Sequence, residues 1–158
     1  MKNFSKREPI IPARSIGGVS LGDDARETAK RIEIAGEEVT REAFQSIGGT
    51  FALWRVEGWG LEFVEADTRI TKVSCTLGYE GSYGEMLYPG IQVAQVRTMA
   101  SKILFVHGML VLNGEFGVVL EVPVVYRGQK YDDIDSIDEL PLDMRLDWVH
   151  VMDREWWR

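Results

Sequence analysis

"TFALWRVEGWGLEFVEADTRITKVSCTL", residues 50–77, is the stretch that decides the fold. Apolar and polar side chains alternate along most of it, which is the pattern of β-strands that turn one face toward a core. Gly58 and Gly60 divide it into separate strands, and Asp67 with Thr68 is typical of a hairpin tip. The stretch predicts consecutive antiparallel strands with apolar positions at Phe51, Leu53, Val56, Trp59, Leu61, Phe63, Ile70, Val73, Cys75 and Leu77.

The segment GGVSLGDDARETAKRI, residues 17–32, precedes this sheet and is rich in glycine. A phosphate-binding loop needs a Lys after its last Gly and a Ser or Thr for magnesium, and neither is present. Asp23 and Asp24 stand there instead, where carboxylates repel an anion but cap a helix N-terminus. The segment predicts a short strand over 19–21 and a helix whose apolar face is formed by Ala25, Thr28, Ala29 and Ile32.

The remaining patterns indicate both helices and strands. Residues 1–15 read as an extended arm, because two prolines discourage a helix there. Downstream, runs with helical spacing alternate with short apolar runs bounded by Gly-containing turns. We expect helices over 37–46 and 94–106, and strands over 109–113 and 116–126.

Three short motifs recur in the second part of the chain, which suggests an internal repeat. Each recurrence keeps the residue types at matching or nearly matching offsets. The pairs are GVSL with GIQV (18–21 and 90–93), RETAKRI with RTMASKI (26–32 and 97–103), and YEGSY with YRGQKY (79–83 and 126–131).

The predicted fold is a single α+β domain with an antiparallel sheet and helices on one face. The repeat predicts two related strand–helix–sheet halves, 16–84 and 85–140, followed by a C-terminal segment, 141–158. The alternative is one continuous curved sheet wrapped around a helix.

The charge of the chain bounds its partners. The formal net charge is −7, which argues against nucleic acid or an anionic membrane as the main partner and permits a basic protein. No apolar run reaches the roughly 20 residues that span a bilayer, and the N-terminus lacks the apolar region of a secretory signal. Cys75 is the only cysteine. Together these features predict a cytoplasmic protein.

Residues 131–147, YDDIDSIDELPLDMRLD, carry almost the whole charge excess. Only Arg145 opposes the acids, and interleaved Ile and Leu residues allow the segment to anchor on a core. The segment lacks the central Gly of a calcium loop, so we expect no calcium site. It is either a solvated acidic surface or a docking surface for a basic partner, with Tyr131 and Trp156 as aromatic anchors. Its acids are Asp132, Asp133, Asp135, Asp138, Glu139, Asp143 and Asp147.

Catalytic motifs are absent from the sequence. His107 and His150 have no metal-site spacing, although a distant Ser or Cys nucleophile beside either one stays open. A ligand pocket is a second option within the Trp-rich strands. Alternation favours aromatic rings in the core and acids in water. The pocket residues would be Trp54, Trp59, Glu62 and Glu65.

LGDDARETAKRI, residues 21–32, resembles the helix start of the tandem-repeat β-lactamase inhibitor proteins, with Asp23 and Asp24 in place of Met-Thr. The paired cysteines of that family are absent here. In size, acidity and layout the chain also resembles the immunity proteins of bacterial toxin systems, including contact-dependent growth inhibition. That resemblance implies a protein that binds and neutralises a toxin domain, often a basic nuclease.

The expected function is therefore a cytoplasmic inhibitor that blocks a basic partner, most plausibly a toxin domain, through an acidic face. We expect neither enzymatic activity nor a cofactor or metal. One alternative is a small enzyme or ligand carrier that uses a Trp-lined pocket with His107 or Glu62. Another is a structural or accessory subunit of an assembly, which open sheet edges and self-association would favour.

Overall fold

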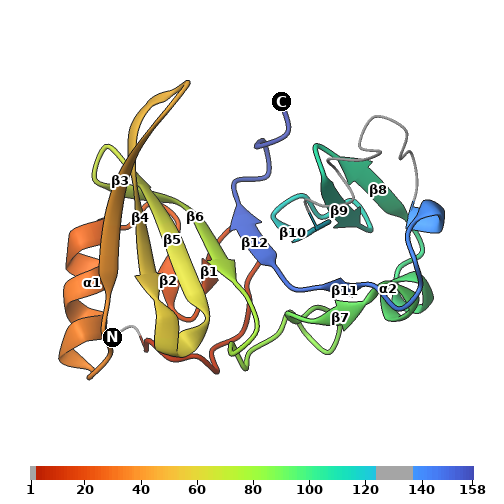
Figure 1. The fold of residues 1–158 in the computed structure, drawn as a ribbon, viewed down its shortest axis with the longest axis horizontal. Helices are drawn as coiled ribbons and strands as arrows, with labels where there is room; N and C mark the ends of the chain where they lie inside the picture. Colours follow the sequence, from red (N-terminus) through yellow and green to blue (C-terminus); the bar gives the residue numbers. More distant parts are fainter. Residues whose placement is uncertain (1–2, 124–136) are drawn as a thin grey trace.

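The computed structural model describes residues 3–123 and 137–158. Within these residues, an eight-stranded antiparallel sheet crosses the whole molecule in the order β3-β4-β5-β6-β12-β10-β9-β8 (Figure 1). Two α-helices and two short two-stranded sheets accompany it. The α+β class with an antiparallel sheet is as the sequence predicts. Four predicted site residues, Tyr131, Asp132, Asp133 and Asp135, lie outside the described residues.

The helices and strands have the following bounds. The two α-helices are α1 (Ala25–Ile34) and α2 (Val93–Met99). The large sheet consists of β3 (Thr40–Ser46), β4 (Gly49–Val56), β5 (Leu61–Ala66), β6 (Arg69–Cys75), β8 (Ile103–Val106), β9 (Met109–Leu112), β10 (Val118–Glu121) and β12 (Val149–Met152). The small strands and 3-10 turns are β1 (Ser15–Ile16), β2 (Val19–Ser20), β7 (Ile91–Gln92), β11 (Arg145–Leu146), η1 (Glu57–Trp59) and η3 (Ile137–Glu139).

Helix α1 begins where the sequence predicts. The Asp24 side chain accepts a hydrogen bond from the Glu27 backbone N–H at 2.9 Å, which satisfies one of the open donors of the first turn. The predicted apolar side of the helix is buried, and it consists of Ala25, Thr28, Ala29 and Ile32. The helix lies near β4, and its Arg26 guanidinium is positioned over the Trp54 ring of that strand.

One expected helix, over 37–46, is wrong, and the expected helix over 94–106 is shorter than predicted. Residues 40–46 form strand β3, which pairs with β4 through seven register positions. Its Arg, Glu, Ala and Gln are good helix formers, but tertiary pairing overrides a weak intrinsic preference. Helix α2 ends at Met99, and residues 103–106 form strand β8 instead of its last turn. The Asn113 side chain accepts hydrogen bonds from the backbone N–H groups of Ser101 and Lys102, and these bonds fix the turn between α2 and β8.

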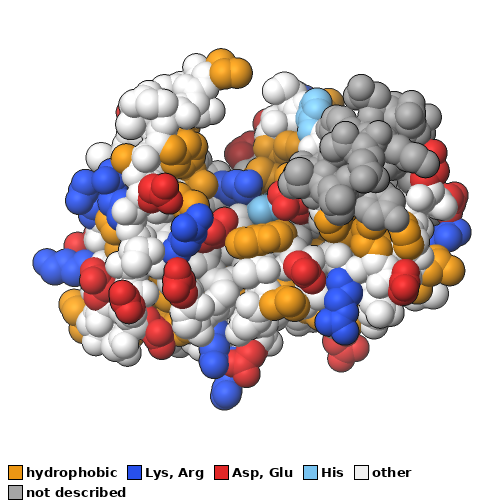
Figure 2. All heavy atoms as spheres, in the orientation of Figure 1, with side chains coloured by type: hydrophobic (Ala, Val, Ile, Leu, Met, Phe, Trp, Pro, Cys, Tyr) orange, Lys and Arg blue, Asp and Glu red, His pale blue; other side chains and the backbone are white. Residues whose placement is uncertain are grey.

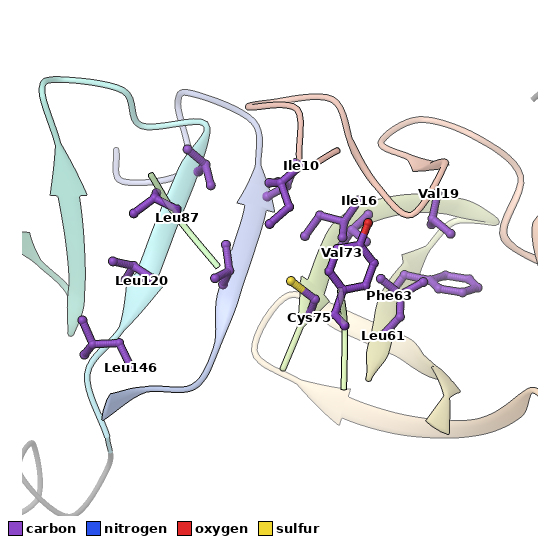
Figure 3. Close-up of a cluster of buried hydrophobic side chains, with 14 of the residues drawn as sticks. Ile10, Ile16, Val19, Leu61, Phe63, Val73, Cys75, Leu87, Leu120 and Leu146 are labelled. Carbon is purple, nitrogen blue, oxygen red and sulfur yellow. The ribbon is translucent and has the colours of Figure 1, made fainter. Parts of the chain in front are cut away.

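The two faces of the large sheet differ in chemistry. On one face, a row of cross-strand partners is apolar and buried, and it consists of Val56, Leu61, Cys75, Val149, Leu120 and Leu110. These residues form one core cluster with Ala29 and Ile32 of α1, Val93 and Val96 of α2, and Ile10 and Ile16 of the N-terminal arm. Figure 3 shows part of this cluster. Both helices therefore lie on this face, as expected.

The strands fall into two sets that meet at the middle of the sheet. Helix α1 is followed by β3, β4, β5 and β6, and helix α2 is followed by β8, β9, β10 and β12. The sets join where β6 pairs antiparallel with β12. The segment 141–158 thus supplies a central strand of the sheet, since β12 lies between β6 and β10.

Candidate functional site

The face of the sheet opposite the helices, here called the polar face, carries a row of polar side chains. Arg55, Glu62, Ser74 and His150 are register partners on the adjacent strands β4, β5, β6 and β12. Each precedes or follows a residue of the buried apolar row, so alternation places all four on the same side. The row crosses the joint between the two sets of strands.

A hydrogen-bond chain occupies the centre of this row. Ser74 Oγ lies 2.6 Å from His150 Nδ1, and His150 Nε2 lies 3.2 Å from Glu121 Oε1. A neutral imidazole satisfies both contacts when Nε2–H donates to the carboxylate and Nδ1 accepts from the hydroxyl. Trp148 stacks almost parallel on the His150 ring, with centroids 6.1 Å apart. The histidine is thus held on several sides.

The residue types of this chain resemble a nucleophile, a base and an acid, but the geometry disfavours acyl transfer. Ser74 and His150 are only 2% and 3% exposed, so a substrate carbonyl has no access to the hydroxyl. Ser74 also lies within β6, which is paired on both sides by β5 and β12. Its neighbouring backbone N–H groups serve the ladder and provide no oxyanion donors. The hydrogen-bond chain of Ser74, His150 and Glu121 is therefore a polar network whose buried members have hydrogen-bond partners within the protein.

A cavity of about 380 Å³ lies beside Trp148. Glu57 and Glu62 bring two carboxylates to its wall, and Arg55 brings one guanidinium. Arg55 is already engaged, because its Nε lies 3.4 Å from Glu62 Oε2 and its Nη1 lies 3.8 Å from Glu42 Oε2. Because Arg55 already pairs with Glu62, the features of the lining that can favour a cationic side chain are the carboxylate of Glu57 and the indole of Trp148. We call this space the Trp148 cavity.

The described part of the acidic segment is anchored as its apolar residues suggest. Ile137, Leu140 and Leu146 are buried, and β11 pairs with β7. Asp138 forms an ion pair with Arg97 Nη2 at 2.6 Å, while Glu139 and Asp143 are exposed. Figure 2 shows several Asp and Glu side chains at the end of the molecule where α2 lies.

Asp147 ends the acidic segment and directly precedes Trp148. Its Oδ1 is buried and has no hydrogen-bond partner among the residues that the structure describes. A buried carboxylate oxygen without a donor costs free energy, so this position favours an added donor. We define the acidic surface as Asp138, Glu139, Asp143 and Asp147. Chain continuity connects this surface to the Trp148 cavity.

Trp156 lies elsewhere and is used within the chain. Its Nε1–H donates to the Phe116 carbonyl at 2.7 Å, and its ring meets His107 edge to face at 6.2 Å. His107 is exposed at the turn between β8 and β9. The structure therefore brings His107 to the C-terminal tail and Glu62 to the Trp148 cavity.

Two of the predicted pocket residues, Trp54 and Trp59, are core side chains, whereas Glu62 lines the Trp148 cavity. Trp54 and Trp59 are buried, and Trp54 Nε1–H donates to Glu65 Oε1 at 2.8 Å. The expectation that both acids face water is wrong for Glu65, which is 8% exposed. Glu65 shares the parity of Phe63 in β5, so it points toward the helices, where Arg41 Nε lies 3.7 Å away. Glu62 has the opposite parity and faces the Trp148 cavity.

Neither the contact between Ser74 and His150 nor the position of Trp148 beside them was predicted from the sequence. The shared parity of Trp148 and His150 in DWVHVMD is a usable signal for one common face. The partner strand is not readable from the sequence, because 73 residues lie between the end of β6 at Cys75 and the start of β12 at Val149. None of the helices in the described ranges is long and apolar enough to span a membrane.

Comparison with known proteins identifies the fold alone. No family model and no curated protein matches this sequence. Among solved structures, the chain is similar to the crystal structure of the uncharacterized protein YfeY from Escherichia coli. The two have 11% sequence identity over 96% of each chain, with a TM-score of 0.56. The arrangement of helices and strands is shared, and no residue role follows from it.

Proposed function

We propose that this protein is a binding protein that neutralises a basic protein partner, most plausibly a bacterial toxin domain, by covering its cationic cleft. The observation that carries the proposal is the continuity of the acidic surface with the Trp148 cavity. Exposed carboxylates of Glu139 and Asp143 lead to Asp147, and the next residue lines a cavity that holds Glu57 and Glu62. This path joins exposed negative charge to an open cavity beside Trp148.

The proposed contact has two physical parts. Exposed carboxylates raise the rate of encounter with a cationic partner, because complementary fields steer diffusion. A Lys or Arg side chain of the partner then enters the Trp148 cavity, whose lining includes Glu57, Trp148 and the Arg55–Glu62 ion pair. Asp132, Asp133, Asp135 and Tyr131 belong to the same proposed surface by sequence. Trp156 is left out, because its indole N–H is bonded within the chain.

Inhibition by occlusion needs no chemistry from this chain. The buried Ser74–His150–Glu121 chain supports the sheet under the cavity rather than acting on a substrate. The proposal places the protein in the cytoplasm, and the single cysteine agrees with that, because Cys75 is buried in the core and needs no disulfide.

We further propose that the two sets of strands are related halves, in which each helix precedes four antiparallel strands. The GVSL and GIQV motifs support this, because they coincide with β2 and β7, each located just before a helix. The RETAKRI and RTMASKI motifs do not, since Arg26 is near the start of α1 and Arg97 is near the end of α2. The proposed relation between the two halves rests on the order of their helices and strands more than on sequence similarity.

A capture experiment tests the proposed function. Tagged protein is cross-linked in cells of the source organism, and captured proteins are identified by mass spectrometry. The test variant reverses Asp138, Glu139 and Asp143 to Lys. The control variant reverses three exposed acids away from this surface, Glu33, Glu38 and Glu85, to Lys.

We expect the wild type and the control to capture the same basic protein and the test variant to lose it. The purified partner must then bind the wild type directly and lose its own activity in the complex. Equal capture by the test variant contradicts the acidic surface as the contact, and a partner that stays active contradicts neutralisation.

A further inference from the structure

The two edges of the large sheet are protected very differently. Strand β8 is short, is half-buried along its length and contacts η3. Strand β3 has seven residues, and every one of them is exposed. Exposed edges are a liability that natural proteins usually cover, shorten or break with Pro, Lys or a bulge. Strand β3 has no Pro, Lys or bulge, although it carries the charged residues Arg41 and Glu42.

The backbone of β3 has unused pairing capacity. It pairs regularly with β4 from Thr40–Arg55 to Ser46–Gly49, and the described residues give it no second neighbouring strand. Only alternate residues of an antiparallel edge strand direct their N–H and C=O groups toward the sheet. The remaining groups of β3 point outward, in the geometry that another strand would bind.

Apolar side chains accompany this edge. Phe44 is 40% exposed and stacks on Phe51 of β4 with ring centroids 5.6 Å apart. Ile47, at the turn of the β3–β4 hairpin, is fully exposed. The hairpin projects from the body of the molecule in Figure 1, and hydrophobic side-chain atoms lie at its tip in Figure 2. Exposed aromatic and aliphatic groups next to an open edge indicate a protein contact.

We propose that β3 pairs antiparallel with β3 of a second copy of this chain, so that the two large sheets become continuous across a two-fold axis. A two-fold axis perpendicular to the sheet gives an isologous contact, in which each side chain stays on its own face. Each residue of one copy then faces a residue of the same parity in the other copy. Only a few registers of this kind exist.

Charge selects among these registers. Centring the pair on Arg41 or Glu42 places each charged side chain against its own counterpart, which is unfavourable. Centring on Phe44 avoids like charges, and it brings the two Phe44 rings together on the polar face, where each already stacks on Phe51. The Phe44-centred register also allows all residues of β3, together with Ile47, to contact the second copy. The structure favours the Phe44-centred register over a pair centred on Ala43, which would set Glu42 against Phe44.

The dimer would leave the acidic surface accessible. Strand β3 ends the sheet on one side, while β8 and the η3 turn are at the other end. Pairing through β3 therefore points the two acidic surfaces away from each other. This inference is independent of the proposed function, and either can fail alone.

The first test is the oligomeric state of the purified full chain, measured by light scattering and sedimentation over a wide range of concentrations. We expect a monomer–dimer equilibrium, with the dimer lost in Phe44→Lys. The control, Ile34→Lys, changes an exposed apolar residue at the end of α1 and should keep the dimer. A wild-type chain that stays monomeric at every concentration overturns the proposal, as does an unchanged dimer in Phe44→Lys.

The second test is disulfide trapping under mild oxidation. Cys75 is completely buried, and desolvation raises the pKa of its thiol, so the native cysteine does not interfere. Phe44→Cys should give a covalent dimer, whereas Ile34→Cys should not. Trapping by Ala43→Cys without trapping by Phe44→Cys overturns the Phe44-centred register.

Discussion

The polar residues of this protein form two clusters with opposite surroundings. Ser74, His150 and Glu121 form a hydrogen-bonded chain at the joint of the sheet, where Ser74 and His150 are almost completely buried. The acidic surface, in contrast, faces water at the α2 end and has a buried carboxylate oxygen without a donor at Asp147. The first cluster is thus an internal part of the sheet, whereas the second presents carboxylates to solvent, where we propose that a partner binds.

The largest expected effect on stability comes from the buried cluster. His150→Ala removes an imidazole that touches Ser74, Glu121 and Trp148, and it leaves a space in the middle of the sheet. We expect the free energy of unfolding to fall by about 3 kcal/mol, from lost hydrogen bonds and a cavity. His107→Ala is the matched control at an exposed turn, and should change it by less than about 0.5 kcal/mol. Urea denaturation measures both. Equal effects would remove the distinction between the clusters.

A smaller effect is expected from an ion pair of intermediate exposure. Arg154 donates twice to Glu115, from Nε at 2.9 Å and from Nη2 at 2.7 Å, which ties the C-terminal tail to the turn after β9. These bonds, aided by the Gly117 N–H, lower the pKa of the Glu115 carboxyl although partial burial opposes them. A lowered folded-state pKa stabilises the fold above the unfolded pKa, and this contribution disappears as the pH falls through the folded value.

The variant Glu115→Gln checks this sign. At neutral pH its free energy of unfolding should be lower than that of the wild type by no more than about 1 kcal/mol, because the pair is partly exposed to solvent. The difference should shrink once the pH falls below the ordinary glutamate pKa, near 4.5. Denaturation at a series of pH values measures it. A difference that grows toward acid pH would show that the pair is not what stabilises the tail.

The smallest expected effect belongs to the acidic surface. Asp138→Asn removes an exposed ion pair with Arg97, and such pairs contribute about 0.2–1 kcal/mol. We expect the free energy of unfolding to fall by an amount at the low end of that range. High salt should reduce this loss further, because it screens the ion pair. Thermal unfolding at low and high ionic strength measures it. A loss as large as that of His150→Ala would mean that the acidic surface is part of the scaffold.

The sequence predicted the helices, strands and turns that depend on residues close together in the chain. Helix α1, its Asp24 cap and its buried side follow from spacing, and the strands β4, β5 and β6 follow from alternation in residues 50–77. The β5–β6 turn also follows, since Asp67 and Thr68 both have positive φ angles, as a tight hairpin requires. These features depend on neighbours only a few residues away.

Features that depend on distant partners were not predictable. Strand β3 exists because β4 pairs with it, although TREAFQ on its own favours a helix. Strand β12 completes the sheet from the far end of the chain, so its register with β6, and therefore the Ser74–His150 contact, was not readable. The acidic surface was found from composition alone. Its connection to the Trp148 cavity required the structure, because residues of β4 and β5, residues just after β6 and the residue before β12 line that cavity.

The most direct test of the central claim is the rate at which the captured basic partner associates with this protein, measured by stopped-flow fluorescence at several salt concentrations. We expect reversal of Asp138, Glu139 and Asp143 to Lys to slow association strongly and to flatten its salt dependence, while the Glu33, Glu38 and Glu85 control stays close to the wild type. Equal rates and equal salt slopes for the two variants would rule out the acidic surface as the contact.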